Sequence, residues 1–182
     1  QAQIDARLDA GRLPKETTYR VLPDPDGKRV GSGGATFHVM KYLSEQGGGA
    51  DFFRGKRILV IHSGGDSKRV PQYSACGKLF SPVPRELPDG RRSTLFDEFM
   101  IGMAGMPSRF REGMLVLSGD VLLLFNPLQI DFTFHGAAAI SIKEDVDTGK
   151  DHGVFLGNAE GYVANFLHKQ SEERLRKLAG TD

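Results

Sequence analysis

Glycines and basic residues follow an apolar run in the first half of the chain. Arg57–His62 is largely aliphatic and leads directly into Ser63–Arg69, which reads Ser-Gly-Gly-Asp-Ser-Lys-Arg, and Lys78 follows shortly after. Glycine lets a backbone approach a ligand closely, and successive N–H groups can point at phosphate oxygens. An arginine can bind a phosphate through two parallel hydrogen bonds, whereas a lysine supplies a point charge on a flexible stem. The segment therefore predicts a phosphate-binding loop with Arg69 and Lys78 as its cations.

Two glycine segments supply candidate nucleotide-binding residues. In the loop itself they are Gly64, Gly65, Asp66 and Ser67. About thirty residues earlier lies a second glycine loop, Gly31–Thr36, in which Gly33 and Gly34 are predicted to line the same nucleotide pocket. The alternative interpretation of Ser63–Arg69 is a surface turn whose cations are solvated.

Neither glycine segment completes a common nucleotide-binding motif. A P-loop has Ser or Thr after its Gly-Lys pair and a glycine five positions before that pair. Here Leu79 follows the pair and Gln72 occupies the earlier position. The first segment ends in Thr36 where a dinucleotide-binding fingerprint has Gly or Ala. The sequence therefore argues against an ATPase of the P-loop class and against a typical dinucleotide site.

A carboxylate follows a second apolar run. Met114–Leu117 precedes Ser118–Asp120, much as Ile58–Ile61 precedes the phosphate-binding loop. In parallel sheets ligands bind beyond the carboxyl ends of the strands, so both segments are expected at one edge. Mg²⁺ is commonly held by one or two carboxylates together with substrate phosphates, which makes Asp120 the predicted metal ligand. The alternative role for Asp120 is that of a turn or capping residue.

Strand-like and helix-like stretches alternate along the chain. The predicted helices cover residues 2–13, 37–43, 95–106 and 171–178, and the predicted strands cover 19–22, 58–61, 114–117, 137–142, 152–155 and 163–167. This alternation predicts an α/β fold with a mostly parallel, mixed sheet and flanking helices. The length of 182 residues predicts one domain over 1–182, with a leading helix and strand in 1–24 and the catalytic core in 25–182.

Composition argues against several classes of protein. The 24 basic and 23 acidic residues leave a formal charge of +1, so no overall field attracts nucleic acid or an anionic membrane. One cysteine, Cys76, allows no internal disulfide and is interpreted as structural. No apolar run approaches the ~20 residues that cross a bilayer. A cytoplasmic location is expected.

Five segments together resemble a known family. They are Gly31–Thr36, Ile61–Pro71, Gly77–Pro84, Ser118–Asp120 and His152–Phe155, in this order. The combination resembles the fucose-1-phosphate guanylyltransferases, and most of all the pyrophosphorylase half of bacterial bifunctional fucokinase/GDP-fucose pyrophosphorylases. The resemblance extends over nearly the whole chain.

The resemblance implies a Rossmann-like sugar-nucleotidyltransferase fold with the nucleotide over the carboxyl edge of the sheet. It implies the reaction of GTP with L-fucose 1-phosphate to give GDP-L-fucose and pyrophosphate. Arg69 and Lys78 match the arginine that ends the family's glycine loop and the lysine that follows it, and Asp120 matches the Mg²⁺-binding aspartate. It further implies that this chain is truncated at its C-terminus, because further strands are expected to complete the sugar site and to supply a second acidic metal ligand.

Two other functions stay open at the level of sequence. A non-catalytic nucleotide-sensing module would keep the glycine segments without a completed site. A pyrophosphorylase for another sugar phosphate, or for a uridine nucleotide, would use the same cations, because phosphate-binding loops do not read bases. The sequence assigns no oligomeric state.

Overall fold

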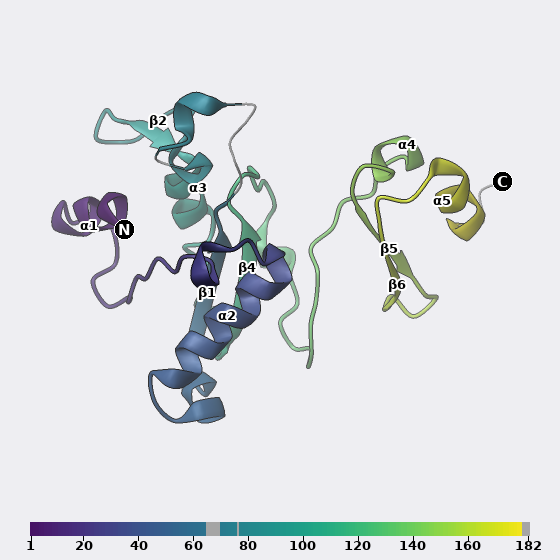
Figure 1. Ribbon diagram of the computed structural model, residues 1–182, viewed down its shortest axis with the longest axis horizontal. Helices are drawn as coiled ribbons and strands as arrows, with labels where there is room; N and C mark the ends of the chain where they lie inside the picture. The colour runs from purple at the N-terminus through teal and green to yellow at the C-terminus, as the bar shows by residue number, and fades with distance from the viewer. Residues whose placement is uncertain (65–69, 76, 180–182) are drawn as a thin grey trace. The chain divides into compact units, whose positions relative to one another are not determined.

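The computed structural model describes residues 1–64, 70–75 and 77–179 (Figure 1). The chain forms two compact units, Gln1–Thr133 and Phe134–Asp182. The α/β class predicted from the sequence is confirmed. Within the described ranges, no helix is both long and apolar enough to span a membrane.

A parallel pair of strands lies at the centre of the first unit. Strand β1 (Arg57–His62) pairs with β4 (Gly113–Ser118), with Arg57 opposite Gly113 and His62 opposite Ser118. Both are near-continuous apolar runs, the pattern typical of parallel strands. Because the strands run in the same direction, the residues that follow them leave from the same edge, as the sequence predicted.

Helix α3 (Leu95–Gly102) builds the core of the first unit. Thr94 caps it: the Thr94 hydroxyl accepts from the Asp97 N–H while the Asp97 carboxylate accepts from the Thr94 N–H. Phe96 and Phe99 on its apolar face are at most 4% exposed and cluster with Leu117 of β4. Helix α1 (Ala2–Asp9) joins the same cluster through Ile4. The predicted helices at 2–13 and 95–106 are thus confirmed in shorter form.

Helix α2 (Gly31–Glu45) corrects one prediction. Gly31–Thr36 was expected to be a loop ahead of a helix, but these residues form the first turns of α2, which lies along β1 (Figure 1). The Thr36 hydroxyl closes this region by donating to the Ser32 carbonyl at 2.9 Å. Gly34 packs so closely that a Cβ there would lie 2.8 Å from the Val30 Cβ. Gly34 therefore suits close packing beside Val30, and the low helix propensity of glycine conceals the helix in this segment.

An antiparallel hairpin and several short turns complete the first unit. Strands β2 (Pro82–Glu86) and β3 (Arg92–Thr94) form the hairpin. Short 3-10 helices lie between the larger elements: η1 (Pro25–Gly27), η2 (Gly49–Phe53), η3 (Pro71–Tyr73), η4 (Lys78–Phe80) and η5 (Pro127–Gln129). The predicted strand at 19–22 is not a strand in the structure.

The second unit combines a hairpin with two helices. Strands β5 (Gly153–Gly157) and β6 (Val163–His168) pair antiparallel, and α4 (Val146–Gly149) and α5 (Glu172–Ala179) flank them in sequence. Helix α5 begins as predicted, with the Arg174 N–H donating to the Ser171 hydroxyl at 3.3 Å. The predicted strand at 137–142 is absent, and its Ile142 is 79% exposed.

The expectation of a mostly parallel sheet is wrong for the described residues. Their strands form three two-stranded sheets, one parallel and two antiparallel. The antiparallel pairs join strands that are close in sequence, and short connections permit only that direction. The β1–β4 pair has the long intervening chain that a parallel connection requires.

Candidate functional site

The carboxyl edge of the parallel pair is shaped by a close approach between two backbones. The Gly119 N–H, just beyond β4, donates to the His62 carbonyl oxygen at the end of β1, with an N···O distance of 2.8 Å. A Cβ added to Gly119 would lie only 2.8 Å from that oxygen. Only glycine fits here without displacement, and this contact places the next residue, Asp120, beside the start of the loop at Ser63.

Lys78 and Asp120 meet at this edge. The Lys78 ammonium lies 3.3 Å from the Asp120 Oδ2, and the Ser118 hydroxyl donates to the Asp120 Oδ1 at 2.7 Å. The Ser118 hydrogen bond is the main cause that lowers the Asp120 pKa; Lys78 adds to it, and together they outweigh the opposing effect of burial. Asp120 is therefore a carboxylate at neutral pH. Two of the three predicted catalytic residues are brought together, and Ser118 is a partner that sequence analysis missed.

The backbone just before Lys78 passes beside Ser63. Gly77 has a φ of 76°, a left-handed conformation that favours glycine, and a Cβ there would lie 3.5 Å from the Ser63 Oγ. Lys78 then begins the short helix η4, in which Leu79 is only 7% exposed and packs in the core cluster. A buried leucine thus anchors the lysine next to it, while the Lys78 side chain remains 30% exposed.

The first glycine segment reaches the same edge through a side-chain hydrogen bond. Thr36 Oγ1 and His62 Nε2 are 2.8 Å apart, which ties α2 to the last residue of β1. Gly33 is exposed and Gly34 is partly buried in the first turns of α2. The contact between Thr36 and His62 was not predicted from the sequence. Its only sequence signal is position: Thr36 ends the glycine segment Gly31–Thr36, and His62 ends the apolar run Arg57–His62.

The remaining predicted site residues lie outside the part of the chain that the structure describes. They are Gly65, Asp66, Ser67 and Arg69. Gly64 is described: it is exposed, and among the described residues a Cβ there would meet no atom within 4 Å. The nucleotide-binding roles of these residues stay predictions.

Asp120 is the described residue whose chemistry suits a metal ion at this edge. Within residues 1–64, 70–75 and 77–179, no three or more His, Cys, Asp or Glu side chains gather as a metal centre. Asp120 offers a half-exposed carboxylate, its side chain being 49% exposed. A single hard oxygen donor suits an ion such as Mg²⁺, which takes its other ligands from water and substrate phosphates. The donor chemistry is compatible with the predicted Mg²⁺ site, which stays a prediction.

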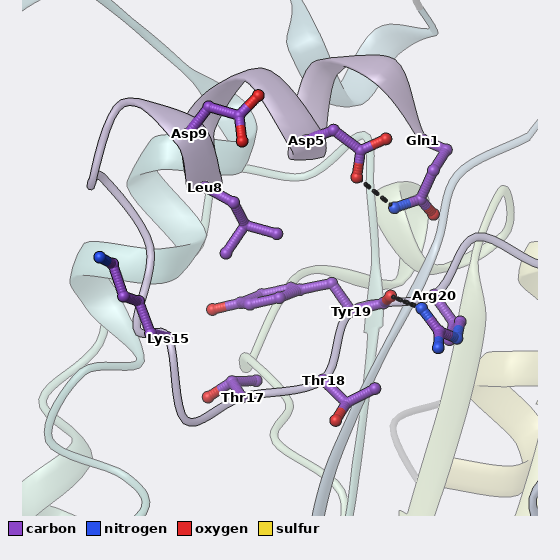
Figure 2. A pocket seen from close by; sticks show the side chains of 9 residues that line it. All are labelled: Gln1, Asp5, Leu8, Asp9, Lys15, Thr17, Thr18, Tyr19 and Arg20. Carbon is purple, nitrogen blue, oxygen red and sulfur yellow. Dashed lines mark hydrogen bonds between the residues drawn. The ribbon is translucent and has the colours of Figure 1, made fainter.

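A separate cleft of about 560 Å³ lies between α1 and the segment after it (Figure 2). Leu8 and Tyr19 face it from opposite sides, and charged residues of both signs surround them. None of the described candidate site residues lines this cleft.

The fold and the site define an α/β protein with a lysine–aspartate pair at the carboxyl edge of parallel strands. The sequence profile of the fucose pyrophosphorylase domain matches residues 50–181, which include both members of this pair. The chain belongs to the fucose pyrophosphorylase family, as the five segments predicted. No solved structure matches the chain.

Curated relatives share this family resemblance over nearly all of the chain. The Bacteroides fragilis L-fucokinase/L-fucose-1-P guanylyltransferase is 44% identical over 91% of this chain. The bifunctional fucokinase/GDP-fucose pyrophosphorylase of Arabidopsis thaliana is 32% identical over 92%, and the fucose-1-phosphate guanylyltransferase of Mus musculus is 31% identical over 97%. These matches cover 18%, 19% and 31% of the three relatives respectively, so the chain spans less than a third of each.

Proposed function

We propose that the protein containing this chain transfers a guanylyl group from GTP to L-fucose 1-phosphate, giving GDP-L-fucose and pyrophosphate. The observation that carries this proposal is the Lys78–Asp120 pair, which stands at the carboxyl edge of β1 and β4 inside the segment matched by the family. The relatives named as fucose-1-phosphate guanylyltransferases support the choice of reaction. We also propose that further strands extend the β1–β4 pair into a Rossmann-like sugar-nucleotidyltransferase sheet.

The reaction is an in-line displacement at phosphorus. A phosphate oxygen of L-fucose 1-phosphate bonds to the α-phosphorus of GTP, while the bond from that phosphorus to the oxygen of the departing pyrophosphate breaks. This chemistry asks for no covalent help from the protein, so orientation and charge neutralisation supply most of the rate. Lys78 orients and neutralises phosphate oxygens near the reacting centre, and Arg69 stabilises the pyrophosphate as it leaves.

Asp120 holds Mg²⁺ in this proposal. When bound, the ion neutralises phosphate charge that the protein's cations do not cover. The Ser118 hydroxyl on the Asp120 Oδ1 keeps the carboxylate ionised and fixes its orientation.

The exposure of the lysine–aspartate pair suits an exchange of partners. The Lys78 and Asp120 side chains are 30% and 49% exposed, and ion pairs so exposed contribute about 1 kcal/mol or less. Lys78 can therefore leave the carboxylate for a phosphate at little cost. A fully buried pair would resist that exchange, because each separated charge would remain desolvated.

A substrate panel tests this proposal against its two rivals. The full-length protein is incubated with Mg²⁺, with GTP, UTP or ATP, and with L-fucose 1-phosphate or another hexose 1-phosphate, and pyrophosphate release is measured. The proposal predicts that GTP with L-fucose 1-phosphate gives the highest kcat/KM. A preference for UTP or for another sugar phosphate would indicate a different pyrophosphorylase. Calorimetric binding of GTP without turnover of any pair would indicate a nucleotide-sensing module.

A further inference from the structure

A side-chain hydrogen bond joins helix α2 to strand β1. Thr36 Oγ1 and His62 Nε2 are 2.8 Å apart, and both side chains are partly buried. Among the described residues, it is the only side-chain hydrogen bond that joins α2 to another element. No residue of α2 is fully buried, and Phe37 is 73% exposed. Since hydrophobic stabilisation scales with buried area, α2 gains less from packing than α3, whose Phe96 and Phe99 are at most 4% exposed. The bond to β1 therefore contributes a larger share of its attachment.

The hydrogen bonds of Thr36 set the direction of this contact. A threonine hydroxyl has one proton, and that of Thr36 is donated to the Ser32 carbonyl oxygen at 2.9 Å. With that donation the Thr36 oxygen is left to accept from the imidazole, which assigns the proton of a neutral His62 ring to Nε2. In this assignment Thr36 sets the tautomer and the orientation of the His62 ring.

His62 also connects to the loop that carries Asp120. Its carbonyl oxygen accepts from the Gly119 N–H at 2.8 Å, and Ser63 follows it directly. The ring of His62 thus holds α2, while its backbone fixes both segments that leave the sheet edge. A shift of this residue would move α2 and Asp120 relative to each other.

We propose that Thr36 and His62 are positioning residues for the nucleotide, because they hold α2 against the edge that carries Lys78 and Asp120. This inference rests on the proposed function, in which that nucleotide is GTP. In the described structure, neither side chain is hydrogen-bonded to Lys78 or Asp120. Gly33 and Gly34, the residues predicted to line the nucleotide pocket, lie in α2. Release of the His62 ring from Thr36 is therefore expected to change nucleotide affinity, while the His62 backbone contact to Gly119, and with it the position of Asp120, is kept.

Thr36→Val in the full-length protein tests this role, since valine keeps the shape and removes the hydroxyl. Loss of one hydrogen bond is expected to raise the calorimetric Kd for GTP and the KM for GTP about 5- to 10-fold, with kcat changed less than about twofold. Thr36→Ser restores the hydroxyl and is expected to restore the affinity. Ser44→Ala is the matched control, because the Ser44 hydroxyl donates only to the Lys41 carbonyl within α2.

An unchanged Kd for GTP in Thr36→Val, a failure of Thr36→Ser to restore affinity, or a fall in kcat at constant KM would overturn the proposal. Absence of GTP binding by the wild type would overturn it together with the proposed function. Binding of GTP without transfer to L-fucose 1-phosphate would refute only the proposed reaction, and the Kd comparison would still decide the positioning role.

The ring tautomer gives a readout that needs neither turnover nor a stable Thr36→Val variant. Nitrogen-15 spectra of the histidine-labelled wild type, with the His62 signal assigned by its loss in His62→Gln, are expected to show a proton on Nε2 when the ring is neutral. A neutral ring protonated on Nδ1 would contradict the bond on which the inference depends.

Discussion

Gly119→Ala perturbs the candidate site without touching a charged group. The added Cβ would lie 2.8 Å from the His62 carbonyl oxygen, about 0.5 Å inside the shortest ordinary carbon–oxygen contact of about 3.3 Å. The obstacle is backbone, so the Gly119 segment must move away. That movement weakens the Gly119–His62 hydrogen bond and carries Asp120 with it. A misplacement of about 1 Å can cost about 100-fold in rate, so a shift of about half that size predicts a loss on the order of tenfold in kcat/KM.

The assay compares Gly119→Ala with Gly102→Ala in the full-length protein. Gly102 ends α3, is exposed, and would meet nothing within 4 Å if it carried a Cβ. Pyrophosphate release is followed with varied GTP, and the thermal midpoint is measured for both variants. Overpacking at Gly119 is also expected to cost about 1–3 kcal/mol of stability, whereas the Gly102 variant should be at least as stable as the wild type, because alanine favours a helix over glycine. Wild-type kcat/KM and stability in Gly119→Ala would refute the argument that this close approach positions Asp120.

Two further predictions concern the cation of the site and the packing of the core. Lys78→Ala should cost on the order of 2 to 4 kcal/mol of transition-state stabilisation, comparable to losing one oxyanion-hole donor. The control is Lys150→Ala, which removes a surface lysine paired with Asp147. If Lys78→Ala lowers kcat/KM no more than this control does, Lys78 is only a surface charge. Asp97→Asn should lower the free energy of unfolding by about 1.5–3 kcal/mol at pH 7, because the carboxylate accepts charged hydrogen bonds from Arg7, whose Nε lies 3.1 Å away. Burial raises the Asp97 pKa, but hydrogen bonds from Arg7 and Thr94 together outweigh burial and lower it. Since the folded pKa lies below the unfolded one, this contribution is complete above about pH 4 and is lost as pH falls through the folded pKa. Urea unfolding of the wild type and of Asp97→Asn, at pH 7 and at acid pH, measures this difference in unfolding free energy. The difference should shrink at acid pH, and an equal difference at both pH values would contradict the prediction.

The sequence predicts best those elements in which the spacing of apolar residues agrees with the capping or glycine residues at their ends. Strands β1 and β4 are continuous apolar runs that end in glycine-containing segments, and both were predicted. Helix α3 combines apolar spacing with a capping Thr94. The approach of Lys78 to Asp120 followed from the order of segments along a parallel pair, because such strands deliver their carboxyl ends to one edge.

The missed parts depend on contacts that local pattern does not encode. The first four residues of Gly31–Thr36 are glycine or serine, which have low helix propensity and favour a loop. Tertiary contacts nevertheless make the segment helical. Strand β2 contains Pro82 and Pro84, which conceal strand character and are tolerated at the edge of a sheet. The apolar run at 137–142 has strand composition but pairs with no described strand. A hydrogen bond between Thr36 and His62 joins distant segments, so periodicity could not predict it.

The central claim is that the edge holding Lys78 and Asp120 performs guanylyl transfer to L-fucose 1-phosphate. The most direct test measures GDP-L-fucose formed by the full-length wild type and by Asp120→Asn at saturating GTP and Mg²⁺. The substitution keeps the side-chain shape, and its partner Lys78 is partly exposed, so the fold should persist by circular dichroism. The account predicts steady product formation by the wild type and its abolition in Asp120→Asn. Unchanged GDP-L-fucose formation by a folded Asp120→Asn would contradict it.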